Sequence, residues 1–299
     1  MLLTQELPYS TAHHLAQELL GVSVARSTLY RLTMHYGQAL EPALAEPIEV
    51  QPQPDSVVYA MADGLMLLFD EGYKEVKLGR LFAQSKLSPS PVANRGGCIA
   101  ESTYVAHVGS WADFWPNWQK QIEAWRAAGQ SVVFLNDGVS WLQEKLRQAY
   151  PDSLQILDIY HVMEQLAGLA RQAISGVAAR QKWLAKAYEL LTHAGLDVLL
   201  KRIDRLAVKR SEAQRVAGYL KRNRSRMAYG CYLAQGLCIG SGAIESANKA
   251  VVQQRMKRAG QRWSKPGAQR VLNLRSCWMS GRWPLVKALI EPGSYSMAA

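Results

Sequence analysis

The sequence contains few cysteines, and their spacing fits neither a metal site nor a disulfide framework. Four of the 299 residues are cysteines, and no two of them form a C-x-x-C pair: Cys98, Cys231, Cys238 and Cys277. A zinc ribbon requires such pairs, and a small secreted fold requires many cysteines for its disulfides. We therefore expect reduced thiols and exclude a disulfide-rich scaffold.

Long apolar segments are also absent. No run of about 18 apolar residues exists to cross a bilayer, and the N-terminus lacks the basic region and apolar stretch of a signal peptide. These absences predict a cytoplasmic protein without a membrane partner. The composition, 48% hydrophobic and 20% charged, is typical of a globular chain that forms one large domain or two to three smaller ones.

Motifs for covalent nucleophilic catalysis are missing as well. The sequence has no G-x-S-x-G segment, which would place a serine on the sharp turn that hydrolases use. Tyr160 is the one tyrosine whose position suggests a phosphotyrosyl mechanism, because it precedes His161. Its apolar surroundings favour a packing role instead. We therefore expect chemistry that does not use a covalent enzyme intermediate.

Acidic residues are absent from one long segment of the C-terminal region. No Asp or Glu occurs from Ser246 to Ile290, whereas ten basic residues do: Lys249, Arg255, Lys257, Arg258, Arg262, Lys265, Arg270, Arg275, Arg282 and Lys287. A second basic block lies within 199–227, and the chain has a net charge of +11. Clustered Lys and Arg are typical of proteins that bind nucleic acid, because they release phosphate counterions. A generally basic globular protein is the alternative.

The N-terminal region has the pattern of a helix-turn-helix. Two apolar stripes of helical spacing within 11–37 are separated by Gly21-Val22-Ser23. In a helix-turn-helix the second helix enters the major groove of DNA. The exposed reading positions would then be Arg26, Ser27, Thr28, Tyr30 and Arg31. Because helical hairpins are common and the region has no positive excess, a purely structural hairpin is equally compatible with the pattern.

The rest of the chain predicts a mixed α/β fold. A Pro-rich linker at 46–55 is followed by apolar strands at 57–62, 65–69, 75–82 and 103–108, with a loop at 88–97. Tryptophans at helical spacing predict a helix over 111–125 that buries them in the core rather than stacking them on bases. A strand at 131–136, a helix at 139–150 and a strand at 154–159 follow, and 162–238 is almost wholly helical in pattern.

Three separated acids suggest a metal site. Asp63 and Asp137 each follow an apolar strand and precede a glycine, and Glu245 lies in the first turn of a predicted helix. Phosphodiester cleavage commonly uses two divalent ions, and Mg²⁺ needs only a few carboxylates from different elements. Asp-Gly is also an ordinary turn signal, and an acid in a first helical turn complements the helix dipole. Asn248 and Lys249 lie one turn after Glu245, so the same face could hold a phosphate.

A further motif, Asp158-Ile159-Tyr160-His161, is expected at the end of the last apolar strand, 21 positions after Asp137. A D-x-x-H sequence often occurs by chance, and His161 could be a buried, hydrogen-bonded imidazole. Its place directly before the helical region is the reason for including it among the candidate functional residues.

The motifs resemble those of a known family. In chain order MADG, NDG, DIYH and GSGAIESANKAVVQQRMK…GQRWS resemble the DDE transposases of bacterial insertion sequences, most closely the Kra group. They are more distantly similar to Mutator-like transposases, which share an Asp or Cys followed by x-x-His after the second Asp. The resemblance covers about residues 55–285 and is strongest over 240–264.

The resemblance implies a ribonuclease-H-like α/β catalytic core with a large all-helical insertion. Asp63, Asp137 and Glu245 would be the catalytic, metal-binding triad for two Mg²⁺ or Mn²⁺ ions, with Asp158 and His161 as an accessory motif. The implied parts are a helix-turn-helix-like segment (1–45), a linker (46–55), the first part of the core (56–161), the insertion (162–238) and the rest of the core with its basic helix (239–299).

The implied partner is double-stranded DNA, both the ends of the element and its target, bound by a homodimer or larger assembly in the bacterial cytosol near the nucleoid. No small-molecule substrate is expected. The residues expected to bind DNA are Asn248, Lys249, Arg255, Lys257, Arg258, Arg262, Lys265, Arg26 and Arg31.

Two other functions remain open from the sequence. Family members often carry a longer N-terminal region, so this chain would be a shortened or domesticated copy that binds DNA without cutting it. A structure-selective nuclease of the same fold would cut DNA without strand transfer. Because all three acids are present, an active transposase is the preferred hypothesis.

Overall fold

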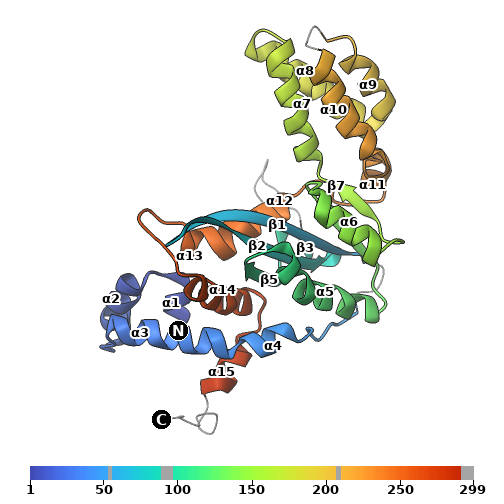
Figure 1. Cartoon of the computed structure of the whole chain (residues 1–299). Coiled ribbons are helices and arrows are strands. Elements are labelled where there is room, and N and C mark those ends of the chain that lie inside the picture. Colours follow the sequence, from blue (N-terminus) through green and yellow to red (C-terminus); the bar gives the residue numbers. More distant parts are fainter. Residues whose placement is uncertain (53–55, 89–96, 207–209, 291–299) are drawn as a thin grey trace. The chain divides into compact units, whose positions relative to one another are not determined.

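The computed structural model describes residues 1–52, 56–88, 97–206 and 210–290 of an α/β chain. The chain divides into two compact units. Unit 1 comprises residues Met1–Val132 and Gly242–Ala299, and unit 2 comprises Val133–Ser241. Figure 1 labels most of the helices and strands of both units.

The sheet of unit 1 contains three long antiparallel strands in the order β5-β2-β1. Strand β1 (Val58–Phe69) pairs along its whole length with β2 (Gly72–Ala83), and β2 pairs with β5 (Thr103–Val108). The hairpin turns at Asp70-Glu71, and Gly72, which begins β2 directly after the turn, has a φ of 98° that is accessible to glycine at little cost.

The predicted strand end at Asp63-Gly64 is wrong. Strand β1 continues through both residues, with Asp63 opposite Leu78 of β2. Pairing with β2 over twelve residues stabilises the extended conformation there, so the Asp-Gly turn signal has no effect on the backbone. Asp63 therefore lies in the middle of a strand.

Two short strands after β2 form a separate two-stranded sheet. After a single 3₁₀ turn, η1 (Gln84–Lys86), strand β3 (Leu87–Ser88) pairs with β4 (Cys98–Ile99). The loop predicted at 88–97 falls mainly on 89–96, which lies outside the described residues.

The N-terminal helices belong to the same compact unit as the sheet. These are α1 (Leu2–Glu6), α2 (Tyr9–Leu20), α3 (Arg26–Ala39) and α4 (Glu41–Ala45). The predicted break is confirmed, because α2 ends at Gly21 with a φ of 63°. Helix α3 packs against α14 (Lys265–Met279), where Asn273 Nδ2 donates to the Gly37 carbonyl at 2.8 Å.

The start of the predicted linker is held against a helix. Helix α5 (Trp111–Ala127) contains Gln121, which is fully buried; its Nε2 donates to the Glu46 carbonyl at 3.0 Å and its Oε1 accepts from Ile48 N at 2.9 Å. Residues 53–55 of the linker lie outside the described residues.

The predicted tryptophan helix is confirmed. Ser110 caps α5 by accepting a hydrogen bond from Asp113 N at 3.2 Å. Trp118 and Ile122 are fully buried, and a Cβ placed on Gly79 of β2 would come within 2.5 Å of the Trp118 ring. Trp118 therefore packs closely against the sheet, as the core interpretation predicts, whereas Trp111, Trp115 and Trp125 are only half-buried.

The rest of unit 1 follows Gly242. It consists of α12 (Gly242–Ala247), a π-helical segment η4 (Asn248–Gln253), α13 (Gln254–Met256), α14 and α15 (Pro284–Ile290). Helix α12 packs against β1 and β2. A π-helical segment is uncommon and is frequently found at functional sites.

Unit 2 begins with a βαβ arrangement. Strand β6 (Val132–Asn136) leads through α6 (Ser140–Ala149) to β7 (Gln155–Leu157), which pairs with β6 in parallel. The predicted strand at 154–159 is shorter than expected, because helix α7 already begins at Ile159.

The predicted helical region is confirmed. It contains α7 (Ile159–Ala173), α8 (Val177–Glu189), the π-helical η2 (Leu190–Ala194), α9 (Leu196–Ile203), α10 (Arg210–Arg222), the 3₁₀ turn η3 (Arg224–Arg226) and α11 (Tyr229–Ala234). In Figure 1 the helices α7 to α10 form one bundle. Across the described part of both units, no helix has the length and apolar character needed to span a membrane.

Candidate active site

Asp63 is held by an amide from the segment that follows Glu245. The half-buried Asp63 accepts at Oδ2 from Asn248 Nδ2 at 2.7 Å and at Oδ1 from Gly64 N at 2.7 Å. A hydrogen bond of this length to a carboxylate is a strong, charge-assisted one. Strand β1 and the segment carrying Glu245 are therefore joined at this acid, although 185 positions separate the two bonded residues.

The other end of the Asn248 amide is unsatisfied. Asn248 is 4% exposed, and its Oδ1 atom is buried without a hydrogen-bond partner. Leaving a buried polar atom unpaired costs about 1–3 kcal/mol. An atom of this kind beside a carboxylate is typical of a functional site, because a bound water or ion could supply the missing partner.

Glu245 is exposed on the short helix α12, and the helix is fixed by a buried arginine. Arg80 of β2 is 5% exposed; its Nη1 donates to the Ala243 carbonyl at 2.7 Å and to Ser246 Oγ at 3.2 Å. Burial lowers the pKa of Arg80, which nevertheless remains charged at neutral pH. Arg80 could not be predicted from the sequence, because a single arginine in a strand carries no motif.

Asp137 follows β6, as predicted, in unit 2. Its Oδ1 accepts from Val139 N at 3.1 Å, and Gly138 has a φ of 91°, a conformation that favours glycine. A Cβ at Gly138 would lie 3.5 Å from the hydroxyl of Tyr219 in α10. Helix α10 therefore brings Tyr219 close to the segment that carries this acid.

Two residues of the helical region in unit 2 interact electrostatically with Asp137. Burial raises the pKa of Tyr219 to about 12, and the negative charges of Asp137 and Asp158 act in the same direction. Arg226 is 5% exposed, and burial lowers its pKa while Asp137 and nearby tyrosines raise it. Tyr219 lies in a helical region without a motif, and Arg226 was recognised only as part of the basic block within 199–227, with no signal that linked it to Asp137.

The D-x-x-H motif begins a helix instead of ending a strand. Asp158 is the N-cap of α7 and accepts from Tyr160 N at 3.0 Å. The same buried carboxylate accepts from Ser241 N at 3.0 Å and from Ser241 Oγ at 2.7 Å. Asp158 thus anchors the Gly-Ser-Gly turn that precedes Glu245. The half-buried His161 has its Nδ1 atom 3.6 Å from Glu164 Oε2 on the same helix.

Most of the residues expected to bind DNA are exposed, but two are not. The exposed ones are Lys249, Lys257, Arg258, Arg262, Lys265, Arg26 and Arg31. Arg255 is 1% exposed, with its Nε donating to the Thr4 carbonyl at 3.0 Å, so the predicted surface contact with phosphate is wrong for this residue. Asn248 is also buried, and its amide binds Asp63.

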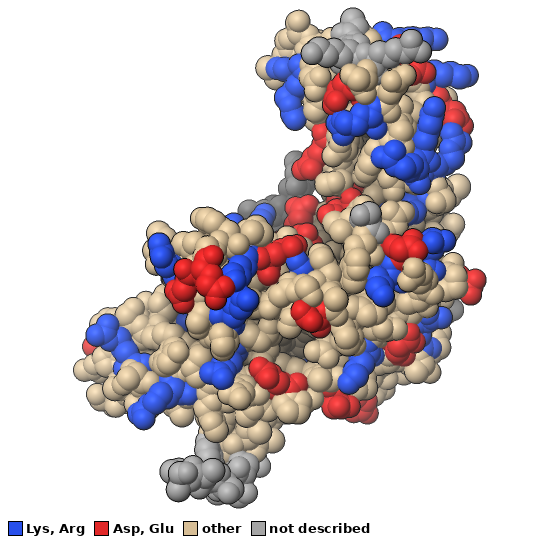
Figure 2. Space-filling view, in the orientation of Figure 1, with Lys and Arg blue, Asp and Glu red and all other residues tan. Residues whose placement is uncertain are grey.

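Basic side chains also gather on unit 2. Figure 2 shows them over the helices of the bundle. Lys201, Arg205, Lys221 and Arg222 are exposed there, whereas Arg215 and Arg224 form ion pairs with Glu212 and Asp197. Exposed cations without such pairs are the ones best able to bind a polyanion.

The donors around Asp63 fit a hard cation in their chemistry. A carboxylate and an unpartnered amide oxygen are ligands that Mg²⁺ prefers, and Mg²⁺ completes its shell with water. Within the described ranges no three His, Cys, Asp or Glu side chains gather as they would around a metal ion. Asp63 and Glu245 belong to unit 1, and Asp137 belongs to unit 2.

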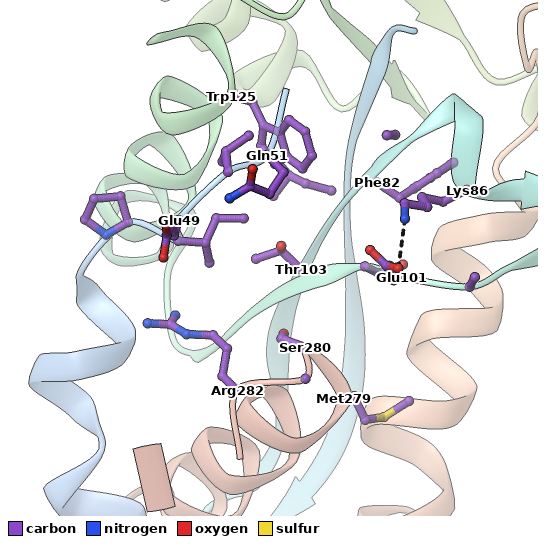
Figure 3. A pocket seen from close by; sticks show the side chains of 18 of the residues that line it. Glu49, Gln51, Phe82, Lys86, Glu101, Thr103, Trp125, Met279, Ser280 and Arg282 are labelled. Atoms are coloured by element: carbon purple, nitrogen blue, oxygen red, sulfur yellow. Dashed lines mark hydrogen bonds and ion pairs between the residues drawn. The ribbon is translucent and has the colours of Figure 1, made fainter. Parts of the chain in front are cut away.

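Unit 1 also contains a cavity that none of the predicted acids lines. It has a volume of about 710 Å³, and Figure 3 shows the side chains that line it. Its basic groups already have partners: Lys86 pairs with Glu101 at 2.8 Å, and Arg282 donates to the Ala43 carbonyl at 2.8 Å. We therefore regard Asp63 of β1, together with Asn248 and Glu245 of the segment bonded to it, as the better candidate site.

Comparison with known proteins does not identify the chain. A scan against protein-family models finds no match, and a search of curated proteins finds none either.

Proposed function

We propose that the chain is a DDE-type transposase of ribonuclease-H-like fold, which cleaves DNA with the help of divalent metal ions and joins the freed 3′ end to a target. The observation that carries the proposal is the 2.7 Å hydrogen bond from Asn248 to Asp63. It joins the first predicted acid to the segment that begins with the third, Glu245. A direct contact between two motifs so distant in sequence is not explained if Asp63 is only a turn residue and Glu245 only a helix-cap residue.

The order of elements along the chain supports the same fold. Three antiparallel strands (β1, β2 and β5) come first, followed by the parallel pair β6 and β7, and a wholly helical region precedes the helix that carries Glu245. This is the order that the resemblance to transposases implies. Asp63 lies within β1, and Asp137 directly follows β6.

In the proposed site Asp63, Asp137 and Glu245 hold Mg²⁺ or Mn²⁺, with two ions expected. Such ions polarise the scissile phosphate and lower the pKa of the attacking hydroxyl. The chain itself supplies orientation: Asn248 fixes the Asp63 carboxylate, and Arg80 fixes the helix that carries Glu245. Orientation of this kind is effective because reacting groups must be held within a fraction of an ångström.

The exposed basic residues bind the DNA backbone in this proposal. Three exposed basic residues follow the proposed catalytic acid Glu245 within thirteen positions of the chain: Lys249, Lys257 and Arg258. They would bind phosphates of the DNA backbone. Each phosphate neutralised by such a residue makes affinity more dependent on salt. As in other transposases, we expect a homodimer or larger assembly on paired element ends.

The test is nicking of supercoiled plasmid by the purified chain in Mg²⁺ or Mn²⁺. We compare the wild type with Asp63→Asn, Asp137→Asn and Glu245→Gln, and we use Asp152→Asn as an exposed control in unit 2. We expect cutting by the wild type and the control, no cutting by the three variants, and unchanged DNA retention in all. Cutting by Asp63→Asn would refute the site, whereas binding without cutting by the wild type would favour a silent DNA-binding protein.

A further inference from the structure

A small cavity lies in unit 1 where the N-terminal helices meet the segment after α13. Its volume is about 340 Å³. Tyr9 of α2 and Tyr30 and Met34 of α3 line one side, and Gln261, Arg262 and Trp263 line the other. The cavity therefore joins the predicted helix-turn-helix to the predicted DNA-binding segment, which are more than two hundred positions apart in sequence.

The lining of the cavity includes a buried arginine, Arg255, for which no ion pair is found among the described residues. Arg255 is 1% exposed, and within the described part of the chain no carboxylate lies within ion-pair distance of it. Its guanidinium lies 5.3 Å from the ring centroids of both Tyr9 and Trp263, and its Nη2 atom has no hydrogen-bond partner. Burial lowers the pKa of Arg255 to about 10, which still leaves it charged at neutral pH.

Arg275 shows that this fold can satisfy a buried arginine. It is also 1% exposed, but its guanidinium pairs with Glu6 at 3.2 Å and donates to backbone carbonyls. Buried charges are normally paired and fully hydrogen-bonded, because desolvation of an unpaired charge is costly. The Arg255 guanidinium therefore has capacity for one more acceptor, and the cavity is where an acceptor could be added.

The rim of the cavity is suited to a flat aromatic ligand with a negative charge. Tyr30 is 48% exposed and contacts Tyr9 edge to face, with ring centroids 5.6 Å apart. Arg262, which is exposed, also lines the cavity, and Asp70 is the acid of the lining. An exposed tyrosine can stack on a nucleobase, and a base edge offers acceptors that arginine binds well.

We propose that this cavity binds one unpaired nucleotide of the DNA substrate. The base stacks on Tyr30 with an acceptor edge directed to Arg255, and its phosphate lies beside Arg262. The volume equals that of about eleven water molecules, enough for a single base with its sugar but not for a base pair. This inference rests on the proposed function for the identity of the polymer, and it adds that the substrate is distorted or frayed where the protein binds it.

The test compares the affinity of the full chain for three DNA duplexes of the same sequence and length. One is fully paired, one carries a single unpaired nucleotide, and one carries a nick with every base paired. Binding is measured without divalent metal, so that no cutting is required. Stacking of one base contributes about 1–3 kcal/mol, so we expect the unpaired nucleotide to tighten binding by about 5- to 150-fold. The nicked duplex should bind like the fully paired one.

Variants assign the preference to the cavity. Tyr30→Ala should bring the ratio of the two dissociation constants close to one, Tyr30→Phe should preserve it, and Arg262→Gln should reduce it. Tyr73→Ala is the matched control, because Tyr73 is 68% exposed on β2 and does not line the cavity. A fluorescent base analogue at the unpaired position should be quenched by the wild type and not by Tyr30→Ala.

Several outcomes would overturn the inference. Equal wild-type affinity for the paired and unpaired duplexes would do so, as would a nicked duplex bound as tightly as the unpaired one, because flexibility would then explain the preference. A ratio unchanged in Tyr30→Ala would also overturn it. These outcomes differ from failure of the proposed function: a chain that cuts DNA without the preference refutes the cavity alone, and a chain with the preference that never cuts refutes the chemistry alone.

Discussion

Replacement of Asn248 by alanine should separate stability from activity. The variant loses the 2.7 Å hydrogen bond to Asp63, and a hydrogen bond to a charged group contributes about 1.5–3 kcal/mol. It also removes the buried Oδ1 atom that has no partner, which relieves a cost of about 1–3 kcal/mol. Because the two terms oppose each other, we expect the free energy of unfolding to change by less than about 1 kcal/mol.

Activity has no such compensation. If the hydrogen bond acts only by orienting Asp63 in the transition state, its loss raises the activation free energy by the same amount, about 1.5–3 kcal/mol. The rate of cleavage then falls by about 10- to 150-fold. The measurement is the single-turnover rate of plasmid nicking in Mg²⁺, together with urea unfolding of the same preparations. The matched control is Asn273→Ala, because Asn273 is also buried but its amide is satisfied on both sides by Gly37 and Gln269.

The control should show the reverse behaviour. Asn273→Ala loses hydrogen bonds without relieving an unsatisfied atom, so it should lower the free energy of unfolding by about 1–3 kcal/mol and leave the rate of cleavage unchanged. A strongly destabilised Asn248→Ala that still cuts at the wild-type rate would refute the reasoning. Asn248 would then be a structural residue of the core.

Three further predictions concern the fold around the site. Gly37→Ala places a Cβ 2.4 Å from the Arg270 backbone oxygen, so it should cost about 1–3 kcal/mol in urea unfolding; no loss would mean that α3 does not pack closely on α14. Burial lowers the pKa of His107 below its ordinary 6.5, so the unfolded chain binds this proton more tightly and stability is lost as the pH falls from 6.5 toward the folded pKa. The melting temperature of His107→Gln should therefore fall less than that of the wild type over this range, and an identical fall would contradict the assignment. Burial also raises the pKa of the Cys277 thiol to about 11, so iodoacetamide near neutral pH should modify exposed Cys98 and spare Cys277 until the chain unfolds, as peptide mapping would show.

Local patterns in the sequence predicted the elements whose stability is local. The helix over Trp111–Ala127, the strand Val132–Asn136 and the break at Gly21 all agree with periodicity or with a turn residue. Asp137 was also located correctly, because a buried apolar run directly precedes it. In each case neighbours in the sequence supply most of the physical reason for the structure.

Interactions between distant residues explain what the sequence could not predict. The turn signal at Asp63-Gly64 has no effect because β2 pairs with the strand across it, and the hairpin turns at Asp70-Glu71 instead. The burial of Arg255 depends on a carbonyl of α1 and on the ring of Tyr9. No spacing in the sequence reports contacts of this kind.

The sequence named the residues of the candidate site but not the interactions that hold them in place. Asp63, Glu245 and Asn248 were all named from motifs, whereas the hydrogen bond that joins two of them was not foreseen. Arg80 was missed altogether, although it fixes the helix that carries Glu245. A motif identifies the chemical groups, and tertiary packing decides which of them are held together.

The most direct measurement of the central claim exchanges the ligand atom at Asp63. In Asp63→Cys a soft sulfur replaces the hard carboxylate oxygen, and a thiolate binds Cd²⁺ or Mn²⁺ far better than Mg²⁺. If Asp63 is a metal ligand, plasmid nicking by this variant is lost in Mg²⁺ and recovered when Mn²⁺ or Cd²⁺ is added, while Asp63→Ala is not recovered by any metal. Nicking by Asp63→Cys in Mg²⁺ at the wild-type rate would contradict the account.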